Sequence, residues 1–229
     1  MTPFVFPAPA TPSVAIVESS ARFAVRRIYC VGRNYAEHAR EMGNDPDRDP
    51  PFFFSKPADT VVDDGATLPY PQATRNLHHE AELVVAVGLG GKDINPDQAL
   101  DHIWAYAPGN DLTRRDLQKE AKEMRRPWDM AKGFDNSACC GALNPVSAVG
   151  HPEHGRITAH VDGELRQDGD IGDMIWPVAD VVVHLSRFVA LEAGDLIFTG
   201  TPAGVGPIEQ GESCTVAIEG LGSITTTFA

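Results

Sequence analysis

The stretch that decides the fold is His78-His79-Glu80-Ala81-Glu82-Leu83-Val84-Val85-Ala86-Val87. Its second half is apolar and rich in valine, which predicts a buried strand. Side chains two positions apart on a strand point to the same face, so Glu80 and Glu82 are expected side by side. Two neighbouring carboxylates at the edge of a buried strand repel each other and are costly to desolvate, and a hard cation relieves both costs. The stretch therefore predicts a metal site built on a sheet.

Length and composition fit a globular protein. The chain has 229 residues and 42% hydrophobic side chains, enough for one large or two small domains. No apolar run approaches the ~20 residues of a membrane span, so no membrane partner is expected. Residues 1–12 lack the basic start and apolar stretch of a secretory signal. We therefore expect a cytoplasmic location.

The charge is strongly acidic, with 19 Lys and Arg against 32 Asp and Glu and a formal net charge of −13. Proteins that bind nucleic acids are usually basic, because phosphate contacts dominate their affinity, so the charge argues against a nucleic-acid partner. The four cysteines lack the paired C-x-x-C spacing of a zinc site. We interpret them as small buried hydrophobic side chains.

Short strands dominate the predicted order of elements. Strands are expected at 28–32, 52–54, 83–87, 103–107, 158–161, 164–166, 195–199, 213–218 and 224–228. Helices are expected at 34–42, from Asn95, at 113–124 and at 178–191. The polar, turn-rich residues 44–51 should form an exposed loop. We expect residues 1–25 to be an N-terminal tail or an edge strand, and residues 26–229 to be a single catalytic α+β domain, rich in strand.

Asp111 is the predicted third ligand of the metal site. It follows a strand-like segment and comes just before the helix-capping pattern Thr113-x-x-Asp116, where rigid neighbours hold loop side chains. Three carboxylates without a thiolate suit Mg²⁺ or Mn²⁺, which prefer oxygen ligands and keep waters for a substrate to replace. Two alternatives stay open: Asp111 only satisfies backbone donors in a turn, or one of the two histidines before Glu80 joins a zinc site.

His38 and Glu41 lie three positions apart on the predicted helix 34–42, so they share a face. A carboxylate beside an imidazole orients the ring and raises its basicity, which makes it a general base for water. The alternative is an ordinary exposed helix face, since charged neighbours stand on both sides of His38.

Arg115 and Gln118 are also three positions apart, just after Asp111. Arginine binds a carboxylate through two parallel hydrogen bonds, which suits an organic acid beside a metal. The alternative is a surface pair. Lys132 stands in a mostly apolar setting, where its ammonium group either reaches solvent or pairs with an acidic cluster.

Residues 199–206, Thr-Gly-Thr-Pro-Ala-Gly-Val-Gly, follow a predicted strand. Glycines let the backbone approach a ligand closely, and exposed N–H groups attract anions. The segment is not a Walker loop, because the Gly-Lys-[Ser/Thr] ending is missing. A plain turn is the alternative.

Taken together, these segments resemble the fumarylacetoacetate hydrolase family in their order along the chain and in their amino-acid sequence. The resemblance spans residues from about 28 to the C-terminus and rests on Gly32-Arg33-Asn34-Tyr35-Ala36-Glu37-His38, Phe54-Ser55-Lys56-Pro57, His79-Glu80-Ala81-Glu82-Leu83, Asn110-Asp111-Leu112-Thr113, Ala131-Lys132-Gly133-Phe134-Asp135 and the loop 199–206. Each piece alone is weakly specific, whereas the combination is highly specific. Within the family the chain is similar to the small acylpyruvate hydrolases, and around residues 29–43 and 51–59 to bacterial fumarylpyruvate hydrolases of gentisate breakdown.

The resemblance implies a mixed β-roll like the C-terminal domain of that family, with a few flanking helices, a homodimer, and a Mg²⁺ or Mn²⁺ ion. It implies metal ligands at Glu80, Glu82 and Asp111, a water-activating pair at His38 and Glu41, oxyanion-stabilising groups at Lys132 and Gln118, and substrate contacts at Arg115, Gly200 and Thr201. It also implies that the loop after His38 is a lid over bound substrate. The family pattern varies at Gly133, which receives no role.

The expected function is hydrolysis of the carbon–carbon bond of a small 2,4-dioxo acid, most simply fumarylpyruvate to fumarate and pyruvate in aromatic catabolism. Three alternatives use the same residues: decarboxylation of oxaloacetate, isomerisation of a dienoic diacid, and dehydration of a sugar acid. A fourth alternative is a non-catalytic module that binds a metal or an organic acid. The sequence does not specify the acyl group or the physiological metal.

Overall fold

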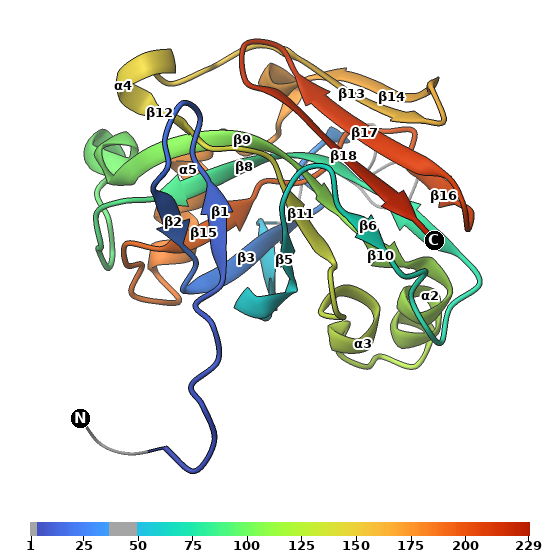
Figure 1. Cartoon of the computed structure of the whole chain (residues 1–229). Helices are drawn as coiled ribbons and strands as arrows, with labels where there is room; N and C mark the ends of the chain where they lie inside the picture. Colours follow the sequence, from blue (N-terminus) through green and yellow to red (C-terminus); the bar gives the residue numbers. More distant parts are fainter. Residues whose placement is uncertain (1–3, 37–49) are drawn as a thin grey trace.

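The structure is a computed structural model that describes residues 4–36 and 50–229. Its largest sheet is mixed and has eight strands (Figure 1). The strand order is β4 (Phe52–Lys56), β3 (Arg27–Gly32), β15 (Asp195–Phe198), β8 (Ala81–Val87), β9 (Ile103–Asp111), β11 (Ala138–Cys140) and β5 (Val61–Val62), and β12 (Asn144–Pro145) also pairs with β9. The predicted strand-rich α+β fold is confirmed.

A five-stranded sheet packs against this large sheet, with β17 and β18 lying on β9 (Figure 1). Its order is β14 (Glu164–Asp170), β13 (Arg156–Val161), β17 (Ser213–Ile218), β18 (Gly222–Phe228) and β6 (Thr67–Leu68). Two small sheets complete the strands: β10 (Thr113–Arg114), β7 (Leu77–His79) and β16 (Gly206–Ile208) form one, and β1 (Ser13–Ala15) and β2 (Arg22–Ala24) form the other. The curled pair of larger sheets agrees with the expected β-roll.

The predicted hairpin at Asp162-Gly163 is confirmed. These two residues join β13 to β14 and have φ angles of 47° and 81°. A two-residue hairpin turn of this kind needs positive φ at both positions, and Asp-Gly adopts it readily.

The central strand β8 is buried on both faces, which explains why residues 83–87 are apolar without alternation. On one face Leu83 and Val85 enter the larger core between the two sheets. On the other face Val84 and Ala86 enter a smaller core that includes residues of β3 and β15. Strand β8 thus anchors both cores.

The face of the smaller core also carries the charged residues of the site. Glu82 has the same parity on β8 as Val84 and Ala86, so it points to this face. Opposite it in the register lies Gly109 of β9, two residues before Asp111. Polar groups therefore begin where the smaller apolar core ends, along one face of the large sheet.

Short helices lie at the edges of the sheets. They are α2 (Arg115–Glu123), α3 (Asp129–Lys132), α4 (Val146–Val149) and α5 (Val178–Ser186), with 3₁₀ turns η1 (Ala58–Thr60), η2 (Pro96–His102) and η3 (Ile171–Asp173). Helices α2 and α3 lie side by side at the end of the large sheet where the site forms (Figure 1). Asn95 caps η2 as expected, because its side chain accepts the N–H of Asp97 at 3.1 Å.

Two local predictions are wrong. Thr113 does not cap a helix: it belongs to β10, its hydroxyl donates to the carbonyl of Asp111 at 3.1 Å, and α2 begins at Arg115 without a side-chain cap. Pairing of β10 with β7 replaces the expected cap. Helix α5 ends at Ser186, and Phe188, expected on its buried face, is 74% exposed.

Other predictions lie outside the described residues. These are most of the helix 34–42, including His38 and Glu41, and most of the loop 44–51, with its proposed role as a lid. The division into residues 1–25 and 26–229 stays a prediction, although β1 and β2 pair with each other and Val14 is buried in the smaller core. Among the described residues, no helix is long and apolar enough to cross a membrane.

The close packing of β9 on β8 predicts the effect of a methyl group at Gly109. A Cβ atom there comes within 2.4 Å of Val84 Cγ2 and 2.9 Å of the Phe198 ring. We expect Gly109→Ala to lower the free energy of unfolding by about 1–3 kcal/mol through overpacking. Urea denaturation measures this, with Gly206→Ala as the control because its nearest contact is at 3.5 Å. Equal stability of the two variants contradicts the expected clash.

Candidate active site

Three buried carboxylates meet at the end of strands β8 and β9. Glu80, Glu82 and Asp111 are 5%, 1% and 0% exposed, and each offers an oxygen within 4.8 Å of the others. Glu80 precedes β8 directly, and its carbonyl accepts the N–H of Asp111 at 2.9 Å, which continues the pairing of the two strands. The side chains that the sequence placed on one face are therefore brought together with the predicted third partner.

Lys132 bridges two of these carboxylates. Its ammonium nitrogen lies 2.7 Å from Glu80 Oε2 and 2.7 Å from Asp111 Oδ2. Burial alone lowers the pKa of Lys132, but Asp111 and Glu80 more than offset this effect and raise it. Of the two environments left open by the sequence, pairing with an acidic cluster is therefore the one observed.

Lys56 is a second buried lysine at the site, and sequence reasoning gave it no role. Its Nζ lies 2.7 Å from Asp111 Oδ1 and donates to the carbonyls of Leu112, Lys132 and Ser137. The contact between Lys56 and Asp111 is an ion pair whose geometry is not that of a hydrogen bond, so Asp111 Oδ1 accepts no hydrogen bond within the described residues. The pattern Phe54-Ser55-Lys56-Pro57 holds the signal, since a lysine on a strand of aromatic residues needs a buried anion.

Arg115 completes the charge compensation at the start of α2. Its Nη2 lies 2.5 Å from Glu80 Oε1, and its Nη1 donates to Gln118 Oε1 at 2.6 Å. Its Nε donates to His78 Nδ1 at 3.3 Å, and His78 Nε2 lies 2.9 Å from Asn76 Oδ1. Burial and the charge of Arg115 lower the pKa of His78 to about 4, so this histidine is neutral near pH 7. The predicted pair of Arg115 and Gln118 is thus a contact within the site.

Glu82 faces the glycine-rich loop. Its Oε2 accepts the N–H of Gly200 at 2.8 Å. Burial raises the pKa of Glu82 well above its usual value, and Asp111 and Glu80 raise it further. Gly200 has a φ of 98°, and a Cβ there comes within 2.7 Å of Asn34, so only glycine fits. The loop is therefore shaped around the site.

Thr201, the next loop residue, is held by a buried glutamine that the sequence did not single out. Gln167 is the one buried residue of β14. Its Nε2 donates to Thr201 Oγ1 at 2.7 Å, and its Oε1 lies 2.9 Å from His79 Nδ1. Because Thr201 Oγ1 accepts this bond, its own hydroxyl proton remains available to a substrate.

The histidine alternative is not supported by the placement of His78 and His79. His78 contacts Arg115, and His79 contacts Gln167 on the opposite side of its strand. Within residues 4–36 and 50–229, the group of side chains spaced to hold a metal consists of carboxylates alone. The four cysteines are free and buried, as expected, and burial raises their pKa values.

These donors fit a hard divalent cation. Carboxylate oxygens are the ligands that Mg²⁺ and Mn²⁺ prefer, and Oδ1 of Asp111 is a buried acceptor without a directed donor. The nearby ammonium and guanidinium groups lower the cost of holding three carboxylates out of water. The arrangement therefore suits a cation together with an anionic ligand.

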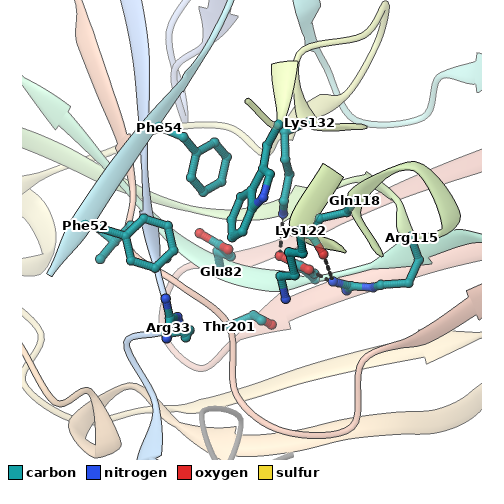
Figure 2. Close-up of a pocket in the computed structure, with 13 residues that line it drawn as sticks. Arg33, Phe52, Phe54, Glu82, Arg115, Gln118, Lys122, Lys132 and Thr201 are labelled. Atoms are coloured by element: carbon teal, nitrogen blue, oxygen red, sulfur yellow. Dashed lines mark hydrogen bonds and ion pairs between the residues drawn. The ribbon is translucent and has the colours of Figure 1, made fainter. Parts of the chain in front are cut away.

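A pocket opens over Glu80 and Glu82, and Figure 2 shows the side chains that line it. Its lining also includes Gln118, Arg115, Lys132, Thr201, Arg33, Phe52, Phe54, Lys122 and Trp128. All the predicted site residues in the described part of the chain thus lie in or beside one pocket. A pocket that joins buried carboxylates to buried cations is the site of an enzyme.

The family follows from comparison with known proteins. The family model described as "Fumarylacetoacetate (FAA) hydrolase C-terminal" matches residues 27–229. The chain therefore belongs to the fumarylacetoacetate hydrolase family, and the expected resemblance is confirmed.

Individual relatives agree with this assignment. A fumarylpyruvate hydrolase from Pseudomonas aeruginosa, solved in complex with Mn²⁺ and pyruvate, is 55% identical, covers 99% of each chain and has a TM-score of 0.96. A fumarylpyruvate hydrolase from a Ralstonia species is 40% identical over 77% of this chain and 91% of its own. The human mitochondrial oxaloacetate tautomerase FAHD1 is 38% identical over 87% of this chain and 90% of its own.

The role of Lys56 in holding Asp111 is open to a stability measurement. Lys56→Met removes the cation and leaves the Asp111 carboxylate short of a charge partner, so we expect unfolding to become about 3–5 kcal/mol easier. Urea denaturation measures this change. Lys92→Met is the control, because Lys92 is exposed and its ion pair with Asp93 spans 4.0 Å. If both variants unfold like the parent protein, Lys56 does not support the site.

Proposed function

We propose that this enzyme hydrolyses the carbon–carbon bond of an acylpyruvate, converting fumarylpyruvate to fumarate and pyruvate. One observation carries the proposal: three buried carboxylates and three cationic side chains form one cluster, and Glu80, Glu82, Arg115 and Lys132 of this cluster line a pocket. A solved relative of 55% identity, a fumarylpyruvate hydrolase, holds Mn²⁺ and pyruvate.

Glu80, Glu82 and Asp111 are the proposed ligands of Mg²⁺ or Mn²⁺. Lys56, Lys132 and Arg115 already balance much of the negative charge of these ligands, so a bound divalent ion makes the pocket attractive to a dianionic substrate. When bound, the ion supplies Lewis-acid polarisation of the 2-oxo group of the substrate.

The substrate contacts follow from the hydrogen bonds in place. Arg115 is the proposed partner of the pyruvyl carboxylate, and Gly200 and Thr201 approach it through the loop backbone and the Thr201 hydroxyl. Gln118 Oε1 accepts from Arg115, so its Nε2 amide is the group left to donate to an oxyanion. The Lys132 ammonium lies beside the same part of the pocket and adds positive charge.

His38 and Glu41 are the proposed water-activating pair. Glu41 orients the imidazole, and His38 takes a proton from water. The hydroxide adds to the C4 carbonyl of the acylpyruvate, and the resulting oxyanion collapses to a carboxylate as the C3–C4 bond breaks. The bonding electrons pass to C3, which takes up a proton to give pyruvate, so the reaction consumes one water and no oxidant.

Decarboxylation or tautomerisation of oxaloacetate is the second candidate. Curated relatives at 37–39% identity carry these activities in their names. A base such as His38 also serves proton transfer without hydrolysis, so the shared residues do not separate the reactions. A non-catalytic binding module is the remaining alternative, and it has no need of the His38 and Glu41 pair.

The proposal of an acylpyruvate hydrolase also includes a cytoplasmic homodimer that acts in the breakdown of an aromatic compound.

A substrate panel tests the reaction. The purified protein is given fumarylpyruvate, maleylpyruvate, acetylpyruvate or oxaloacetate with Mg²⁺, with Mn²⁺ or with a chelator, and the loss of enol absorbance and the products are recorded. We expect fumarate and pyruvate in equal amounts, with turnover lost in chelator and restored by either ion. Turnover of oxaloacetate alone, or of no compound, overturns the hydrolase proposal.

His38→Ala separates water activation from metal binding. Loss of a general base typically costs 10²–10⁴-fold in rate, so we expect kcat for fumarylpyruvate to fall within that range. Calorimetric Mg²⁺ affinity should stay at the parental value, since His38 is not a proposed ligand. Near-full activity of the variant removes His38 from the mechanism.

Glu82→Gln tests the ligand set with little change in shape. Within the described part of the chain, Glu82 accepts a hydrogen bond from the Gly200 backbone and takes part in no ion pair, so the substitution leaves the lysine contacts of its neighbours in place. We expect Mg²⁺ affinity to fall at least tenfold, the scale at which even indirect partners of a metal act. Glu209→Gln, at an exposed position, is the control. Unchanged Mg²⁺ affinity eliminates Glu82 as a ligand.

A further inference from the structure

Two cations line the part of the pocket that the proposed reaction has not used. Arg33 follows β3, and Lys122 lies in the last turn of α2, so they approach the pocket from different elements (Figure 2). In Figure 2 Arg33 lies below Phe52, away from the dashed contacts, whereas Lys122 lies beside these contacts and close to Thr201. Phe52 and Trp128 lie in the same part of the pocket.

Neither cation has an anionic partner within the described ranges 4–36 and 50–229. Lys132, Lys56 and Arg115 each contact a carboxylate at 2.7 Å or less. Arg33 and Lys122 contact aromatic rings instead: Arg33 lies 4.8 Å from the centre of the Phe52 ring, and Lys122 lies 5.4 Å from that of Trp128. Among the described residues, the pocket therefore holds two cations without an anionic partner beside cations that are paired.

The backbone at Arg33 is held in an unfavourable conformation. Its φ of 61° lies in the left-handed region, which is uncommon for a bulky residue. Such strain persists only where the surroundings enforce it, and it concentrates at functional sites. Here Asn34 enforces it: its amide donates to the carbonyls of Thr199 and Trp176 at 2.8 and 3.0 Å and accepts the N–H of Trp176 at 2.8 Å.

Gly32 leaves space for the Phe52 ring, which lies against the Arg33 guanidinium. A Cβ on Gly32 comes within 2.0 Å of Phe52 Cζ, so the tip of the ring occupies the space that a side chain at position 32 would need. The guanidinium lies over this ring, which fixes its position and leaves its N–H donors without a hydrogen-bond acceptor among residues 4–36 and 50–229. The sequence Gly-Arg-Asn thus presents one guanidinium in a defined place at the pocket.

Lys122 adds a second charge nearby. It is exposed at the rim of the pocket. Partial desolvation lowers its pKa, and the like charges of Arg115 and Arg33 lower it further. Cations that repel one another at a pocket rim are stabilised by an anion that bridges them.

We propose that Arg33 and Lys122 form a subsite for a second carboxylate, the one at the far end of the acyl group. This inference rests on the proposed function, in which the pyruvyl end lies at the carboxylate cluster. It defines the substrate class as acylpyruvates whose acyl chain ends in a carboxylate. The rings of Phe52, Phe54 and Trp128 lie along the connecting part of the pocket and suit a flat, unsaturated chain between the two charged ends.

The test compares two substrates that share the pyruvyl end. Fumarylpyruvate carries the distal carboxylate, and acetylpyruvate lacks it. We expect Arg33→Met and Lys122→Met each to lower kcat/KM for fumarylpyruvate by roughly 10- to 100-fold, the range for a lost hydrogen bond to a charged group. The loss for acetylpyruvate should be at least tenfold smaller. Arg33→Lys should recover part of the preference, because it keeps the charge without the fork of donors.

Lys119→Met is the matched control, since Lys119 is exposed on the same helix and does not line the pocket. We expect it to leave kcat/KM for both substrates at the parental value. Equal losses for the two substrates in Arg33→Met place Arg33 at the shared pyruvyl end or in the fold, and overturn the subsite. No loss for either substrate in either variant also overturns it.

A binding measurement keeps this test separate from that of the proposed reaction. Fumarate and pyruvate are titrated into the Mg²⁺-loaded protein by calorimetry, which requires no turnover. If the parent protein hydrolyses neither acylpyruvate, the proposed function fails. The subsite is still supported if Arg33→Met lowers the affinity for fumarate, relative to the parent protein, by more than it lowers the affinity for pyruvate. Parental affinity for fumarate in both Met variants overturns the subsite whatever the activity.

Discussion

The structure depends on the compensation of three carboxylates that lie almost entirely out of water. Glu82 and Asp111 lie on two central strands of the large sheet, Glu80 directly precedes one of them, and Lys132 of the short helix α3 contacts Glu80 and Asp111. Buried ions are tolerated only when geometry and hydrogen bonds are nearly complete. The requirement therefore fixes the positions of β8, β9, α3 and the start of α2 relative to one another, and the catalytic pocket results from it.

The family contains enzymes with different names. Fumarylpyruvate hydrolases and oxaloacetate tautomerases both match most of the chain. Their substrates all present an oxo acid, so residues around the oxo acid are poor discriminators between them. What differs is the remainder of the substrate, which lies toward Arg33, Phe52 and Trp128 if the oxo acid lies at the carboxylates.

How much the sequence could predict depended on the range of the interactions involved. The two-residue period of a strand was enough to pair Glu80 with Glu82, and short-range turn chemistry was enough for Asn95 and Asp162-Gly163. Lys56 and Gln167 were missed because their partners lie far along the chain: Gln167 and His79 are 88 positions apart. The helix cap predicted at Thr113 was wrong, because the local capping pattern was overridden by the pairing of β10 with the distant strand β7.

Gln167 also connects the molecular surface to the pocket. It is the one inward side chain on a strand whose other residues are exposed or half-buried, and it pairs with Ala159 beside a register shift that leaves Arg166 of β14 as the extra residue. A slip of one residue in a strand pair turns every side chain to the opposite face. The register of the β13–β14 hairpin therefore sets the position of Gln167 and, through it, that of the Thr201 hydroxyl. A change in the length of the 162–163 turn that shifts this register would turn Gln167 away from Thr201.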